Sequence, residues 1–174
     1  MRGVTSLAAL AALAIFATAD AASSFTLSVD GLGRVKIGMT VRQVEKAVGQ
    51  SLAVDYPEDE SCGEGVVRGG PDGVAYMFVD HHLARIDIDV PDKGQSPDIK
   101  TEAGVGLGAS MADVQRAYGP RLSIEPDPYD ENEHYLVIKG LRRGREIIFD
   151  TAMGRVDGFR AGLSKPVEYI EGCL

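Results

Sequence analysis

The stretch "VKIGMTVRQVEKAVG", residues 35–49, is repeated in similar form as "VGLGASMADVQRAYG", residues 105–119. The two stretches align without a gap at an offset of seventy residues, with identical Val, Gly, Val, Ala and Gly at matching places. Self-similarity of this kind indicates that one supersecondary unit has been duplicated. We therefore expect two copies of one fold.

Each stretch carries the signals of a short helix. Thr40 and Gln43 have the spacing of a capping box, and Ser110 with Asp113 is a looser version of it. Gly49 and Gly119 end the two helices. Apolar residues at helical spacing form one face in each copy: Val41, Val44, Ala47 and Val48, then Met111, Val114, Ala117 and Tyr118. Helices of about nine residues are too short to be stable alone, so each must pack against a sheet.

The sheets are indicated by alternating strands. "LARIDIDV", residues 83–90, alternates apolar and charged side chains and predicts a strand with one solvent-facing side. "GVAYMFVDHH", residues 73–82, predicts the preceding strand of a hairpin, and residues 134–140, 145–150 and 154–162 repeat the plan. The offset of seventy also aligns Asp80, Arg85, Ile86 and Asp87 with Asp150, Arg155, Val156 and Asp157. We expect this register to continue through the strands.

The predicted fold class is α+β, with two tandem copies of a short helix packed on a three- to four-stranded antiparallel sheet. The first repeat covers residues 22–92 and the second covers residues 101–174. Residues 93–100, rich in Pro, Gly and charge, form the predicted linker.

The N-terminal residues 1–21 have the pattern of a signal peptide. Arg2 precedes an apolar run over residues 7–16, and small residues in Ala-x-Ala spacing follow. The run is too short to cross a bilayer, which needs about 20 residues. Cleavage after Ala19 or Ala21 fits, and we prefer Ala21. The mature chain is then periplasmic or secreted, with no integral membrane segment.

The net charge and the two cysteines can be interpreted for an exported chain. The formal net charge is −8 at pH 7, which disfavours nucleic acid and anionic lipid as partners. In an oxidising compartment the only two cysteines, Cys62 and Cys173, predict a disulfide. It would close a loop of about 110 residues and contribute on the order of 4–5 kcal/mol in the chain-entropy model.

The motif "IGMTVRQVEKAVG", residues 37–49, resembles the signature of the SmpA/OmlA-type envelope lipoproteins. The tandem arrangement resembles the β-lactamase inhibitory protein, whose two similar halves each pack helical segments on an antiparallel sheet. The resemblance implies an envelope protein whose sheet or loops bind another macromolecule. The lipid-acceptor Cys of the lipoproteins is absent here, and the chain has no Trp to form the inhibitor's Trp-rich contact surface.

Candidate chemical sites are weak. His81 and His82 would need a third ligand such as His134 to hold a metal, and a polar hairpin tip is the simpler interpretation. The acidic loop with Asp127, Asp130, Glu131 and Glu133 lacks the spacing and central Gly of a calcium loop. The sequence contains no nucleophile elbow, zinc helix or phosphate loop. We therefore predict no catalytic, metal or cofactor site.

The leading functional hypothesis is a non-catalytic exported protein that binds another macromolecule, a protein partner in the cell envelope. It includes the possibility of inhibiting an envelope or exogenous enzyme. The predicted contact residues are Tyr56, Tyr76, Tyr129 and Tyr135, because tyrosine anchors interfaces at low entropic cost. The alternatives are a structural accessory of outer-envelope assembly and a glycan-binding module.

Overall fold

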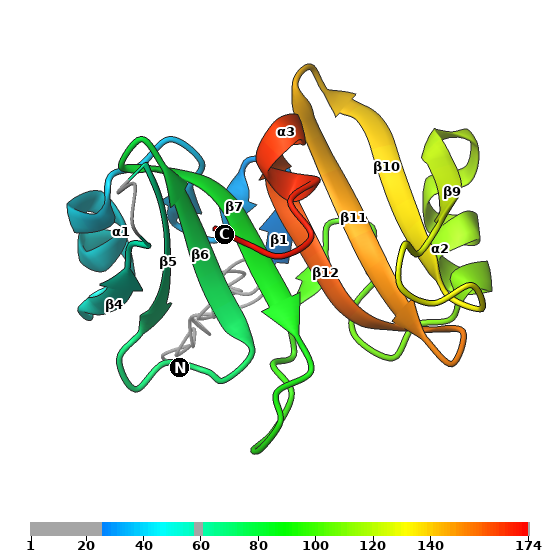
Figure 1. Cartoon of the computed structure of the whole chain (residues 1–174), viewed down its shortest axis with the longest axis horizontal. Helices are drawn as coiled ribbons and strands as arrows, with labels where there is room; N and C mark the ends of the chain where they lie inside the picture. Colours follow the sequence, from blue (N-terminus) through cyan, green and yellow to red (C-terminus); the bar gives the residue numbers. More distant parts are fainter. Residues whose placement is uncertain (1–25, 58–60, 174) are drawn as a thin grey trace, which may run out of the picture.

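The computed structural model describes residues 26–57 and 61–173. Eight strands of one antiparallel sheet carry the fold, in the order β4-β5-β6-β7-β12-β11-β10-β9 (Figure 1). The first-half strands are β4 (Leu52–Asp55), β5 (Cys62–Val67), β6 (Val74–Val79) and β7 (His82–Asp89). The second-half strands are β9 (Leu122–Pro126), β10 (His134–Arg142), β11 (Arg145–Ala152) and β12 (Arg155–Leu163).

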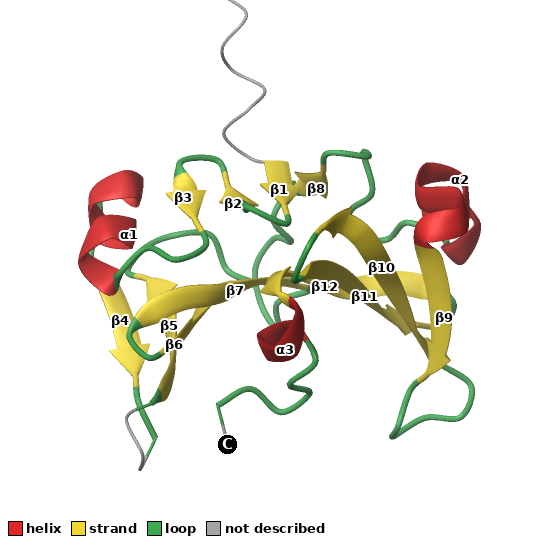
Figure 2. Cartoon of the chain, turned by 90° about the horizontal axis from the view of Figure 1, so that it is seen from above, coloured by secondary structure: helices red, strands yellow, loops and turns green. Residues whose placement is uncertain are grey.

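A small second sheet lies over the middle of the large one (Figure 2). It contains β1 (Thr26–Ser28), β2 (Gly31–Leu32), β3 (Val35–Lys36) and β8 (Lys100–Thr101). Helices α1 (Val41–Val48) and α2 (Met111–Tyr118) flank it on the same side, and a 3-10 turn, η1 (Gly119–Arg121), follows α2. The short helix α3 (Ser164–Val167) lies on the opposite face.

Both predicted helix starts are confirmed. The Thr40 backbone N–H donates to Gln43 Oε1 at 2.8 Å, and the Ser110 N–H donates to Asp113 Oδ2 at 3.0 Å. Each side chain therefore satisfies an end group that would otherwise lack a partner. Val44 of α1 and Val114 of α2 are fully buried against the sheet.

The α+β prediction is wrong, because the protein is mostly β with short helices. The two expected sheets are one sheet, joined where β7 pairs antiparallel with β12 from Arg85↔Gly162 to Asp89↔Gly158. Alternation in a sequence shows which side chains share a face but does not show which strand edges meet. Each half alone would leave the N–H and C=O groups along one edge of β7 or β12 unpaired. Pairing the two edges gives these groups hydrogen-bond partners. We call this β7–β12 ladder the seam.

The strand register also differs from the expected offset of seventy. Gly38 N–H donates to Leu83 O, and Gly108 N–H donates to Val156 O, both at 2.7 Å. Leu83 and Val156 are therefore equivalent, 73 positions apart. Matching β-bulges fall after Met77 and after Asp150, at the same new offset. The alignment of Arg85 with Arg155 and Asp87 with Asp157 is thus a coincidence of sequence, because the second copy is three residues longer before its last strands.

The main core lies between the large sheet and the layer formed by the small sheet and the two longer helices. Phe78, Phe149 and Phe159 are fully buried there, and the Phe149 and Phe159 rings stack with centroids 5.6 Å apart. A smaller cluster on the other face joins Val137 and Ile148 to Val167 of α3. The sheet thus carries the main core on one face and is covered only along its middle on the other.

Candidate functional site

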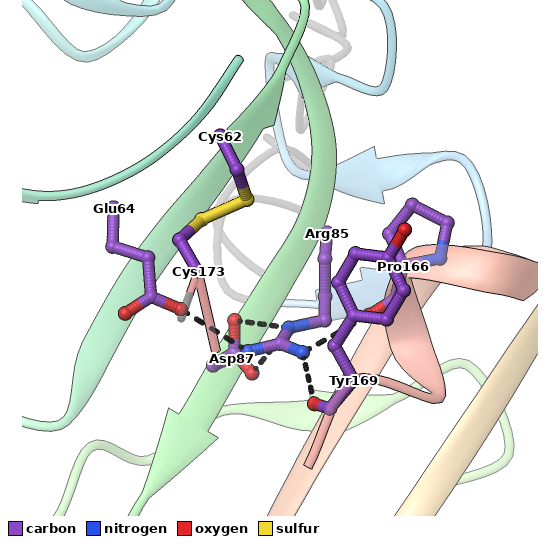
Figure 3. The surroundings of a disulfide bond; sticks show 7 residues. All are labelled: Cys62, Glu64, Arg85, Asp87, Pro166, Tyr169 and Cys173. Carbon is purple, nitrogen blue, oxygen red and sulfur yellow. Dashed lines mark hydrogen bonds and ion pairs between the residues drawn. A yellow bond between two sulfur atoms is a disulfide. The ribbon is translucent and has the colours of Figure 1, made fainter. Parts of the chain in front are cut away.

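The middle of the second sheet face is crossed by residues 164–173, which we call the strap. It begins with α3 and ends at Cys173, and the predicted disulfide to Cys62 of β5 is confirmed, with the two Cα atoms 5.3 Å apart. The strap therefore starts at the end of β12 and is tied to the first half of the sheet. Figure 3 shows the surroundings of this link.

Two arginines on the seam hold the strap. Arg85 of β7 donates to Pro166 O at 3.0 Å and to Tyr169 O at 2.7 Å (Figure 3). Arg160 of β12 donates to Val167 O at 2.6 Å. These carbonyls lie at or beyond the C-terminal end of α3, where helix carbonyl groups often lack backbone partners; Pro166 O also accepts the Tyr169 N–H at 3.2 Å. Both arginine side chains are at least nine-tenths buried.

Each arginine also pairs with carboxylates. Arg85 Nε lies 2.8 Å from Asp87 Oδ1, and Arg85 Nη2 lies 3.3 Å from Glu64 Oε1. Arg160 donates to Asp150 Oδ2 and lies over the Tyr135 ring, 5.3 Å from its centroid. Buried charges are tolerated in folded proteins when they are paired in this way. The first role of the cluster is therefore structural.

The prediction that Arg85 and Asp87 belong to a solvent-facing side of the strand is wrong. Only 6% of the Arg85 side chain and 13% of the Asp87 side chain are exposed. Alternation correctly separated these residues from the apolar face. It gave no sign that a segment eighty residues later would cover them.

A pocket of about 310 Å³ remains beside the strap, and we call it the seam pocket. Its lining includes carboxylates from both halves of the sheet and from the strap: Glu64, Asp87, Asp89, Asp150 and Glu171. Arg85 and Arg160 are the cations in the lining. The pocket therefore carries an excess of negative charge.

Asp89 differs from the other carboxylates of the sheet in this pocket. Its side chain makes no hydrogen bond or ion pair with another residue in the ranges that the structure describes, whereas Glu64, Asp87 and Asp150 each bind an arginine. Asp89 ends β7 and is solvent-exposed as a residue. Partial burial of its carboxyl group in the pocket wall, with the nearby charges of Asp87 and Asp150, raises the pKa of Asp89 to about 7. Burial also raises the pKa of Glu64, Asp87 and Asp150 against the arginine charges.

Gly158 lets two of these carboxylates converge. A Cβ atom at this position of β12 would lie 2.6 Å from Asp89 Oδ1 and 3.3 Å from Asp150 Oδ2. Any other residue would displace them. Asp150 Oδ1 is buried and accepts no hydrogen bond from the described residues. Asp89 and Asp150 therefore provide carboxylate oxygens from both halves of the sheet that accept no hydrogen bond from the described residues.

The four predicted tyrosines do not form one surface. Tyr76 is only 4% exposed and belongs to the main core, and Tyr56 packs on the same side against His81, with ring centroids 5.6 Å apart. Tyr135 lies on the strap side beneath Arg160, and the exposed Tyr129 donates its hydroxyl to Glu171 of the strap. Tyr129 and Tyr135 are therefore the two that lie near the seam pocket.

The other weak candidates are spread apart or occupied. His134 begins β10, three positions along the sheet from β7, so it does not approach His81 and His82. Asp127 and Asp130 accept backbone N–H groups of their own loop, and Glu133 accepts Met153 N–H and the Thr151 hydroxyl. Within residues 26–57 and 61–173, no group of three or more His, Cys, Asp or Glu side chains is placed to hold a metal ion.

The residues missed by sequence reasoning are Arg85, Asp87, Asp89 and Arg160. Their one sequence signal is the spacing of Arg85, Asp87 and Asp89 at every second position of a strand, which puts three charges on one face. Arg160 has no such signal. The predicted signal peptide, residues 1–21, lies outside the described residues, and none of the helices within them is long and apolar enough to cross a membrane.

Comparison of the chain with protein-family models, curated proteins and solved structures finds no match. The resemblance to the SmpA/OmlA-type lipoproteins and to the β-lactamase inhibitory protein therefore stays a prediction.

Proposed function

We propose that the chain is a non-catalytic exported protein that binds a basic protein partner through the seam pocket. The observation that carries this proposal is Asp89, a solvent-exposed acidic side chain that has no protein partner and lines a pocket with excess negative charge. A lysine or arginine side chain of a partner would supply the missing donors. The net charge of −8 would attract such a partner at long range.

The surroundings of the pocket support contact with a large partner. Val66 on β5 is 51% exposed and Ile170 of the strap is 46% exposed, and both are apolar. Tyr129 lies 69% exposed beside the strap. Apolar and aromatic groups around a charged centre are suited to a protein interface. If the partner is an enzyme, we expect binding to lower its turnover.

The test is capture from envelope extract with the mature chain immobilised through its N-terminus, followed by affinity measurement with the purified partner. We expect Asp89→Asn to weaken binding about tenfold, because it removes the charge of one hydrogen-bonded ion pair. Asp98→Asn is the matched control, since the Asp98 side chain is 94% exposed and outside the pocket. Equal affinity of the wild type and Asp89→Asn would refute the proposal.

A further inference from the structure

A second cavity lies on the other face of the large sheet, under α1, and we call it the α1 pocket. Its volume is about 340 Å³, within the range of about 300–1,000 Å³ typical of small-ligand sites. Its walls come from α1, the small sheet and the large sheet, and they are mainly apolar: Leu32, Val35, Ala47, Val48, Val67, Pro71, Val74, Tyr76 and Ile99. Arg34 and Gln50 complete the lining.

The second copy of the repeat has part of this space filled, at the end of its helix, and keeps a cavity of about 370 Å³ beside Gly104, Val105 and Ala117. Val48 is the last residue of α1, and Tyr118 is the last residue of α2. Tyr118 is only 6% exposed, its hydroxyl donates to Thr101 Oγ1 at 2.8 Å, and its ring lies 5.8 Å from that of Phe149. Phe149 is the equivalent of Tyr76, one residue before the bulge position of its own half. At the helix end the second copy therefore has a buried phenol ring, and the first copy has the smaller Val48 beside an opening.

Charge differs between the copies at the same place. Arg34 lines the α1 pocket, is exposed, and makes no hydrogen bond or ion pair with any other residue of the described ranges. Its equivalent in the second copy, seventy residues later, is Gly104. At this place, among the described residues, the first copy therefore has a cation without a protein partner and the second copy has a glycine. An apolar cavity with a single guanidinium matches a ligand with an apolar body and an anionic end.

We propose that the α1 pocket binds a small anionic amphiphile, a carboxylate with an apolar chain or ring. The apolar body occupies the place that the Tyr118 ring occupies in the second copy, and the carboxylate pairs with Arg34. The proposal is independent of the seam pocket, because the two cavities lie on opposite faces of the sheet.

Calorimetric titration of the mature chain with octanoate tests the proposal, with octanol as the uncharged probe of similar shape. We expect octanoate to bind at one site per chain and more tightly than octanol. Arg34→Gln should weaken octanoate binding about tenfold and leave octanol binding unchanged, because only octanoate uses the guanidinium. Equal losses for both probes, or no octanoate binding to the wild-type chain, would overturn the proposal.

The most direct test variant is Val48→Tyr, which places in the first half the side chain that Tyr118 has at the equivalent position of the second half. We expect it to abolish binding of both probes while the melting temperature stays equal or rises, since the ring fills an existing cavity. Ala112→Tyr, on an exposed position of α2, is the matched control and should bind like the wild type. Undiminished octanoate binding by a folded Val48→Tyr chain contradicts the assignment. Concentration-dependent dimers that Val48→Tyr abolishes would mean that a second copy occupies the pocket, and would also overturn it.

Discussion

At the scale of single residues, Asp89 links the stability of the fold to pH. Its carboxyl titrates near pH 7, well above the usual range, because of burial and the charges of Asp87 and Asp150. The folded chain therefore binds a proton that the unfolded chain releases near pH 4. The contribution of Asp89 to stability therefore falls as pH rises from about 4 to about 7, because at this group the folded state holds more protons across that window.

We expect Asp89→Asn to stabilise the protein above pH 7 and to change little below pH 4. The gain is about 1 kcal/mol, once solvent screening at this partly open site is allowed for. Urea denaturation of wild type and variant at pH 4 and pH 8 measures it. A variant whose stability changes equally at both pH values would show that Asp89 does not titrate in this range.

At the scale of elements, the strap depends on both a covalent link and the two seam arginines. The disulfide fixes its end at Cys173, while Arg85 and Arg160 fix the carbonyls of α3 and of Tyr169. The two kinds of restraint act on different parts of the strap. They can therefore be separated by experiment.

The double variant Cys62→Ala/Cys173→Ala should lower the free energy of unfolding by about 2–5 kcal/mol, chiefly because the unfolded chain gains freedom. Hydrogen exchange should accelerate over residues 169–173, while the Val167 region stays protected by its contacts with Val137 and Ile148. The wild type under oxidising conditions is the control. Loss of protection over all of α3 would mean that the disulfide alone holds the strap.

The elements also show where sequence reasoning succeeded and where it could not. The helices were predictable because Thr40, Ser110 and the closing glycines are local signals. The disulfide was predictable because the chain contains only two cysteines. The disulfide also predicts that the last residues are tied to the first half. The strand face that the strap covers was not predictable, since "SKPVEYIEGC" contains nothing that identifies it. The seam pocket could not be predicted for the same reason.

At the scale of the whole molecule, the seam makes one sheet out of two repeats. Phe159 and Ile88 form a cross-strand pair there, and both are buried in the main core. Unfolding either half would expose the other's edge strand and half of the shared core. The expected boundary between residues 92 and 101 therefore separates two sequence repeats, but it does not separate two independently stable units.

We expect a single cooperative unfolding transition, and Phe159→Ala should lower its free energy by about 3–5 kcal/mol. Calorimetry measures both, through the agreement of the calorimetric and van't Hoff enthalpies. Met153→Ala, at a 93% exposed turn residue, is the control and should cost little. Two separate transitions would show that each repeat folds on its own.

The pair Asp87 and Arg160 determines how the two halves would reassemble if they were produced as separate fragments. These residues face each other in the seam and are equivalent, since each lies at the same distance beyond the bulge of its own half. A symmetric homodimer of the first half would put aspartate against aspartate, and one of the second half would put arginine against arginine. The mixed pair joins opposite charges at this position, whereas a first-half homodimer would set its Asp87 repulsion against Arg85 placed opposite Asp89 on either side. Separately produced fragments should therefore reassemble as a heterodimer, and the second-half fragment should reject copies of itself most strongly.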